Sequence, residues 1–267
     1  MMPKIIFFVL AVLFCFTGIA SAQFFIEGGK ESLAVAGGDR ISKSIIIHNT
    51  SSEGHTIRAY WEDFKYDPPF DGTKSFSPSG TGERSLGKWI SFSPTEFTVP
   101  PFSQQKVNYT LVVPDDIDSG HYGVLFFEKV GDPVRVETGM QIITRVGSLF
   151  FVEPKDAVKK AEFQNIVLSE GKLKFSFYNH SAVVLIPDIT YYFMDDQGVV
   201  ADRGDIKKLY LPPDTAGAFD IDLPETLTAH VYTLVVNADL GDNNTVVKEI
   251  EISKDLSDKF TISTMRD

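Results

Sequence analysis

The residues of this chain that could perform chemistry do not have the spacing of a catalytic or metal site. The acid pairs Asp115-Asp116 and Asp195-Asp196 fall in expected turns, whereas a glycosidase requires two carboxylates that face each other across a cleft. No Gly-rich phosphate loop, nucleophile elbow or calcium loop occurs. The histidines also lack metal-ligand spacing: His48, His55, His121, His180 and His230. We therefore expect a protein that is not an enzyme and that holds no metal or cofactor.

The composition excludes further classes of protein. The chain has 267 residues, of which 43% are hydrophobic and 12% aromatic, and it is therefore too apolar for intrinsic disorder. Its formal net charge of -11 argues against nucleic-acid binding, which needs a basic surface. A single cysteine excludes a disulfide framework and a cysteine-based zinc site. The acidic balance also favours a protein partner over a phosphate-rich polymer, because like charges repel.

The first 22 residues have the pattern of a secretory signal peptide. Lys4 precedes a short apolar run over residues 5–16, and the small residues Ala20-Ser21-Ala22 follow. The alternative is a membrane anchor, but the run is short for a span of about 20 residues. We expect cleavage after Ala22, which removes the only cysteine, Cys15, and leaves no further segment long enough to cross a membrane. The sequence thus predicts an exported protein of a bacterial envelope, periplasmic or extracellular.

The remainder of the chain has the pattern of short strands. Runs rich in Ile, Val, Phe, Tyr and Thr alternate with clusters of Gly, Pro, Asn and Asp, and helical periodicity is absent. This predicts an all-β protein with two tandem immunoglobulin-like β-sandwich domains, over residues 23–154 and 155–254, followed by a polar tail over 255–267. The expected strands are Ser44–His48, Thr56–Phe64, Lys88–Phe92, Lys106–Val113, His121–Glu128, Met140–Val152, Ala161–Leu168, Lys172–Tyr178, Asp188–Met194, Ala218–Leu223, Val231–Asn237 and Thr245–Ile252.

The two halves of the chain repeat one another. Pro100-Pro101 and Pro212-Pro213 are each followed by three alternating apolar residues at the same offsets. Asn49 and Ser51 match Asn179 and Ser181, and Tyr122 matches Tyr232. A shared register over this length predicts two copies of one fold. The two tyrosines are candidates for the tyrosine corner of immunoglobulin-like domains, with ordinary core tyrosines as the alternative.

Several stretches carry a resemblance to known families: Trp89–Pro94, Phe97–Pro101, Val113-Pro114, Ser119–Glu128 and Thr144–Val152. They resemble the WxL-interacting surface proteins, which have a peptidoglycan-binding immunoglobulin-like domain followed by a second such domain. More loosely, the chain is similar to the periplasmic pilus chaperones, which are paired immunoglobulin-like domains. It departs from both families. Residues 253–267 are polar where the first family usually has a membrane span and a basic tail. Leu149 stands where pilus chaperones place a basic residue that holds a subunit's C-terminal carboxylate, and Arg145 is the nearest basic residue.

The expected strand Met140–Val152 is a candidate partner-binding element because it is apolar on both faces. Ile143, Leu149 and Phe151 point to one side, and Arg145 shares their alternation. This face could bind a partner by strand addition, could meet the second domain, or could be covered by loops of its own domain.

The segment Tyr66–Arg84 is long for a connection within a sandwich. Long ordered loops often bind ligands, whereas its Pro and Gly content equally suits a mobile loop, which we favour slightly. If the segment binds a partner, the expected contacts are Tyr66, Phe70 and Phe76, since aromatic side chains supply large contact areas.

These observations favour a non-enzymatic envelope or cell-surface binding protein. It would engage a surface protein, or a cell-wall polymer such as peptidoglycan, through loops and an edge strand. The alternative is a periplasmic assembly chaperone of the pilus type that donates the Met140–Val152 strand to an incomplete subunit.

Overall fold

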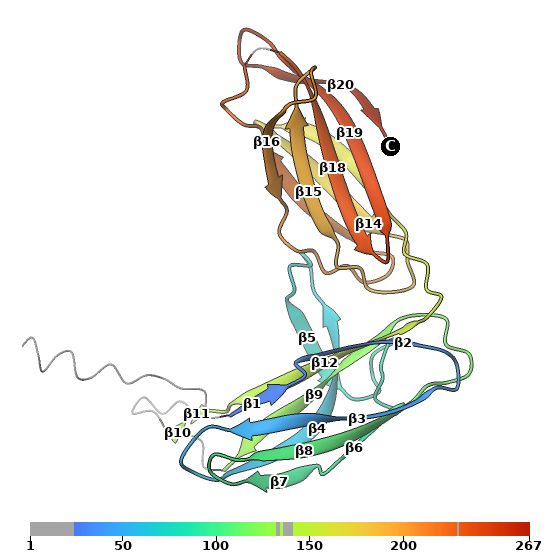
Figure 1. Ribbon diagram of the computed structural model, residues 1–267, viewed down its shortest axis with the longest axis vertical. Coiled ribbons are helices and arrows are strands. Elements are labelled where there is room, and N and C mark those ends of the chain that lie inside the picture. Colours follow the sequence, from blue (N-terminus) through green and yellow to red (C-terminus); the bar gives the residue numbers. More distant parts are fainter. Residues whose placement is uncertain (1–23, 132–133, 136–140, 229) are drawn as a thin grey trace, which may run out of the picture.

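The computed structural model describes residues 24–131, 134–135, 141–228 and 230–267, and within these ranges it contains strands and no helix. Two β-sandwiches follow one another along the chain (Figure 1). The prediction of an all-β protein with two tandem sandwiches is confirmed. The expected signal peptide, residues 1–22, lies outside the described residues.

The first sandwich contains the strands up to residue 154. One sheet has the order β1-β3-β8-β6, and the other has the order β2-β12-β9-β4-β5, with β7 also pairing with β4. A core rich in Ile, Leu and aromatic residues lies between the two sheets. The strands are β1 (Phe24–Glu27), β2 (Lys30–Val35), β3 (Arg40–Asn49), β4 (His55–Tyr66), β5 (Lys74–Pro78), β6 (Ile90–Ser93), β7 (Glu96–Val99), β8 (Gln104–Val112), β9 (His121–Val130), β10 (Val134–Arg135), β11 (Gln141–Ile142) and β12 (Arg145–Pro154).

The second sandwich pairs a three-stranded sheet, β13-β14-β17, with a five-stranded sheet, β16-β15-β18-β19-β20. Its strands are β13 (Ala161–Ser169), β14 (Lys172–Asn179), β15 (Asp188–Met194), β16 (Val200–Asp205), β17 (Ala216–Asp222), β18 (Val231–Gly241), β19 (Asn244–Lys254) and β20 (Phe260–Arg266). The last of these lies in the segment that we expected to be a polar tail. It pairs with β19, and Phe260 and Ile262 pack against the core, so alternate apolar residues hold it on the sheet.

The expected strand Met140–Val152 is divided in two, which corrects the prediction. β11 pairs with β10 in a short hairpin, whereas β12 pairs with β9, and residues 143–144 belong to neither strand. Met140 lies outside the described residues. Within β12 the predicted alternation holds, because Phe150 and Val152 enter the sandwich core while Leu149 and Phe151 face the other way.

The predicted repeat between the halves is visible in two buried asparagines. The side-chain amide of Asn49 donates to the carbonyl oxygens of Val99 and Pro100, and its oxygen accepts from the backbone N–H of Ser51. The amide of Asn179 donates in the same way to Leu211 and Pro212, and its oxygen accepts from Ser181. In each sandwich, one asparagine therefore joins the end of a strand to the Pro-Pro turn.

The match between Tyr122 and Tyr232 fails in three dimensions. Tyr232 points into the second core, and its hydroxyl lies 3.2 Å from the backbone nitrogen of Thr228, as a tyrosine corner requires. Tyr122 faces away from the first core, on the opposite side of β9 from Leu125 and Phe127. Because β9 is buried on both faces, its apolar pattern does not specify which residues turn inward.

The segment Tyr66–Arg84 is not a free loop, contrary to the slightly favoured prediction. β5 pairs with β4 from Glu62 to Tyr66, and the resulting hairpin reaches the second sandwich (Figure 1). At its tip, the carbonyl oxygen of Phe70 accepts a hydrogen bond of 2.8 Å from the backbone nitrogen of Tyr210. The rings of Tyr66 and Tyr210 stack with their centroids 5.2 Å apart. The hairpin thus connects the two domains away from the linker.

Candidate functional site

The outer face of the β2-β12-β9-β4-β5 sheet carries an aromatic cluster that continues into the second sandwich. Its side chains come from β4, β9 and β12, and they meet Val184 of the second domain. Leu149, Phe70 and Tyr210 pack around them. The aromatic cluster consists of Phe64, Tyr66, Tyr122, Val124, Phe126, Phe151 and Val184. It makes this face of the first sandwich apolar where the second domain approaches.

One half of β12 has an unpaired edge beside this cluster. On one side, β12 pairs with β9 from Arg145 to Val152. On its other side, β12 pairs with β2 in parallel, but only from Leu149 to Pro154. No strand of the described residues covers the same side of residues 143–148, which we call the free edge. Ile143, at its start, has 62% of its surface exposed.

The hydrogen-bonding groups of the free edge follow from the pairing with β9. Lys129 donates its N–H to the carbonyl of Thr144, and Leu149 donates to Gly29 on the opposite side. Because successive residues of a strand alternate in direction, the N–H and C=O groups of Arg145 and Gly147 point away from β9. Among the described residues, the free edge therefore presents backbone donors and acceptors without a strand partner, and a strand that approaches in the sheet plane could pair with them.

Two glycines explain why β2 leaves this half of β12 uncovered. β1 pairs with β3 in one sheet, and β2 pairs with β12 in the other, so the chain crosses between sheets at Gly28-Gly29. Gly28 has a φ of 85°, which favours glycine. The hydroxyl of Ser148 donates to the carbonyl of Gly28 and fixes the crossing point against β12.

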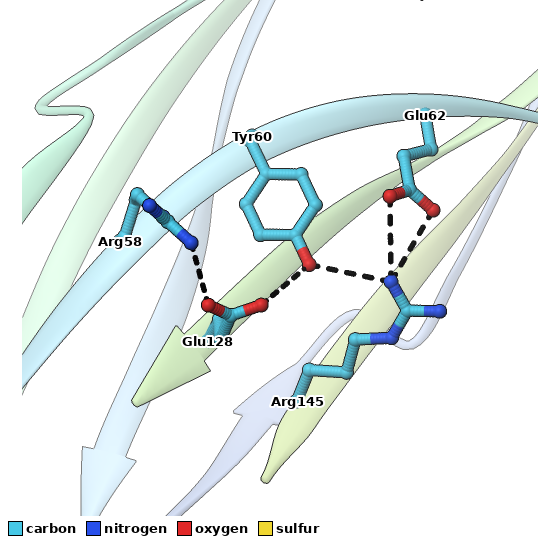
Figure 2. A network of polar contacts seen from close by, with 5 residues as sticks. All are labelled: Arg58, Tyr60, Glu62, Glu128 and Arg145. Atoms are coloured by element: carbon cyan, nitrogen blue, oxygen red, sulfur yellow. Dashed lines mark hydrogen bonds and ion pairs between the residues drawn. The ribbon is translucent and has the colours of Figure 1, made fainter. Parts of the chain in front are cut away.

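A polar network ties the free edge to the sheet (Figure 2). The Nη1 group of Arg145 donates to the Tyr60 hydroxyl at 3.3 Å and to both oxygens of Glu62, at 3.3 and 3.4 Å. Tyr60 donates to Glu128 at 2.8 Å, and Glu128 also accepts from Arg58 at 2.6 Å. The hydrogen bond with Tyr60, followed by the charge of Glu62, raises the pKa of Arg145, so the guanidinium stays charged. Burial raises the pKa of Tyr60, which therefore keeps its proton.

Aromatic rings lie beneath the Arg145 guanidinium. Its central carbon is 4.1 Å from the centroid of the Phe126 ring and 5.3 Å from that of Phe76. Gly147, which pairs with Phe126, leaves room for this ring, because a Cβ at that position would come within 2.9 Å of it. The Arg145 side chain therefore crosses three strands on the outer face, from β12 over β9 to β4.

The residues that we predicted as partner contacts divide into two groups. Ile143 and Arg145 lie on the free edge, and Phe76 is 40% exposed beside Arg145. Leu149, Phe151, Tyr66 and Phe70 instead pack within or around the aromatic cluster. For this second group, the structure favours the domain-interface alternative. We did not predict Tyr60, Glu62 and Glu128 as site residues, although the alternation Arg58-x-Tyr60-x-Glu62 indicates one polar face of a strand.

A cavity of about 520 Å³ lies between the domains, next to the aromatic cluster. Arg84 and Tyr122 line it from the first sandwich, and Asp214 lines it from the second. Among the described residues, no group of three His, Cys, Asp or Glu side chains could hold a metal ion. The same part of the chain has no helix of sufficient length and apolarity to span a membrane.

Comparisons with known proteins identify the fold. No protein-family model matches the sequence, and no curated protein matches it. Among solved structures, a chaperone–tip adhesin complex, described as vital for synergistic activation of CFA/I fimbriae biogenesis, matches with a TM-score of 0.53 and 16% identity, over 85% of this chain and 97% of that chain. The class 5 fimbriae chaperone CfaA matches with a TM-score of 0.52 and 15% identity, over 84% of this chain and 97% of the other.

At these identities the likeness concerns the fold. It supports the looser of the two resemblances seen in the sequence, to periplasmic pilus chaperones, and not the one to WxL-interacting proteins.

Proposed function

We propose that this protein is an exported assembly chaperone that holds a β-rich surface subunit by strand pairing along the free edge of β12. The observation that carries the proposal is the edge itself. It combines outward backbone groups at Arg145 and Gly147 with an exposed Ile143 at its start. A subunit strand that lies along it would continue the sheet and satisfy those groups.

The surroundings of the edge support a protein partner. The exposed side chains of Phe76 and Ile143 give the outer face an apolar surface beside the edge, suited to apolar side chains of a subunit. The two-sandwich fold is shared with the fimbrial chaperone structures, which supports the same conclusion. Binding to peptidoglycan rests on the sequence resemblance alone, and we do not favour it.

Site-specific photocrosslinking tests the proposal. A benzoylphenylalanine at Ile143 should crosslink an exported, β-rich protein in the native cell, and the crosslinked band is identified by mass spectrometry. Val158 is the matched control, because it is 65% exposed, against 62% for Ile143, but lies in the segment between β12 and β13, beyond the end of β12 that is opposite to the free edge. Equal yields from the two positions, or no protein crosslink at Ile143, would contradict strand pairing at this edge.

The variant Ile143→Asp gives an independent test. A charge at the start of an apolar strand interface is costly to desolvate, so recovery of the crosslinked subunit by copurification should fall severalfold. Val158→Asp should leave recovery unchanged, since it adds the same charge away from the edge.

A further inference from the structure

Arg145 connects the free edge of β12 to the rest of the sheet. Backbone pairing holds residues 145–148 from one side only, by β9. An edge that is paired on one side opens more easily than a strand in the middle of a sheet. The Arg145 side chain adds contacts that backbone pairing cannot supply, because it reaches Tyr60 and Glu62 on β4.

We propose that Arg145 is a positioning residue, which keeps the free edge extended and in the sheet plane before a partner strand arrives. This inference rests on the function proposed above and concerns the state of the edge before binding. Preordering lowers the conformational cost of association, since the edge need not become ordered on binding.

The charges of the network favour this role over direct capture of a charged ligand. Arg58 and Arg145 are balanced by Glu62 and Glu128, and every one of these groups is engaged within the network. The guanidinium also lies on Phe126, a ring that is only 6% exposed. A neutral, internally bonded network attracts neither anions nor cations strongly, whereas it does resist movement of the strand that carries Arg145.

Hydrogen exchange on the full mature chain tests the inference. The N–H groups of Val146 and Ser148 point toward β9, so their exchange reports the opening of this half of β12. In Arg145→Met, which keeps Phe126 covered but removes the charge and the hydrogen bonds, exchange at Val146 and Ser148 should rise roughly fivefold to tenfold, as expected for one ion pair and the cation–π contacts with Phe126 and Phe76. Arg145→Lys should recover part of the protection, because it restores the charge but not the planar group.

The matched control is Arg58→Met. Arg58 forms a comparable ion pair with Glu128 in the same network, but it touches no residue of β12 among the contacts of the described chain. Arg58→Met should change the exchange of Val146 and Ser148 less than twofold. Equal acceleration by the two variants, or no acceleration by Arg145→Met, would overturn the inference.

The photocrosslink at Ile143 separates this inference from the proposed function. If Arg145→Met accelerates exchange and lowers the crosslink yield while Arg58→Met does neither, both proposals are supported. If exchange rises but the yield is unchanged, Arg145 orders the edge, but the claim that this order lowers the cost of binding is overturned, while the proposed function remains. If the unaltered protein gives no crosslink at Ile143, the proposed function fails, and the exchange result alone decides whether Arg145 orders the edge.

Discussion

Replacement of Phe70 by alanine should loosen the connection between the two domains. Phe70 is half-buried at the tip of the β4–β5 hairpin, where it packs against both the aromatic cluster and the core of the second sandwich. Full burial of a Phe side chain stabilises by about 1.5–3 kcal/mol, and the partial exposure places Phe70 near the lower end. At 1.4 kcal/mol per factor of ten, the ratio of docked to undocked hairpin should fall roughly tenfold to thirtyfold.

The choice of alanine isolates the loss of the ring. Phe70 has a φ of 66°, a strained value for a residue with a Cβ, and glycine would relieve that strain at the same time. The matched control is Phe76→Ala on the same hairpin, because the ring of Phe76 meets Phe64, Phe126 and the Arg145 guanidinium, all of the first domain. Both variants leave the backbone hydrogen bond from Tyr210 to Phe70 possible.

Double electron–electron resonance between spin labels measures the effect. Labels at Lys106 and Glu249 lie on exposed sites of the first and second sandwiches, and the expected mature chain has no other cysteine. Phe70→Ala should broaden the distance distribution, whereas Phe76→Ala should keep the width of the unaltered protein. A narrow, unshifted distribution for Phe70→Ala would refute the idea that the hairpin tip fixes the domain angle.

Three other predictions concern stability. Asn179→Ala should destabilise the second domain by about 3–5 kcal/mol, because it removes the hydrogen bonds that the amide donates to Val183, Leu211 and Pro212 and the one that its oxygen accepts from Ser181; thermal unfolding followed by hydrogen exchange should show the first domain unaffected. Burial lowers the pKa of His55 from 6.5, so the unfolded state binds protons more tightly, and the free energy of unfolding should fall as the pH drops below 6.5. His55→Gln should therefore weaken the dependence of the melting temperature on pH between 7.5 and 5, and an unchanged dependence would contradict this prediction. Gly147→Ala should cost about 1–3 kcal/mol, since its Cβ would lie 2.7 Å from Val124 and 2.9 Å from the Phe126 ring, and unchanged melting would show that these two side chains can shift.

The sequence predicted those parts of the fold in which one face of a strand is apolar. β8 and β17 alternate cleanly, and the prediction that Val107, Tyr109 and Leu111 match Phe219, Ile221 and Leu223 agrees with their burial in the two cores. β9 is apolar on both faces, so the same reasoning placed Tyr122 and Tyr232 in one register although they point in opposite directions. Periodicity identifies a core face only where the other face is polar.

The candidate site was only partly predictable, because it depends on contacts between distant segments. Apolar residues on both faces of the Met140–Val152 segment predicted a strand that packs into the core on one face and makes contacts on the other. The sequence could not show that β2 covers only the second half of this strand. Pro and Gly in Tyr66–Arg84 suggested a mobile loop, whereas the docking of Phe70 and Tyr66 on the second domain orders the tip. Such tertiary contacts override local preferences for loops.

The crossing at Gly28-Gly29 also limits the length of a partner strand. The free edge over residues 143–148 spans about 20 Å, at ~3.3 Å per residue. Beyond it, Leu149 donates to Gly29 at 3.0 Å, and β2 is held in place by the buried side chains of Leu33 and Val35. A longer partner strand would have to expel β2 and expose those two side chains, which would cost about 3 kcal/mol or more. The partner strand should therefore end where β2 begins. The position of Gly28-Gly29 thus limits the length of subunit strand that can pair with β12.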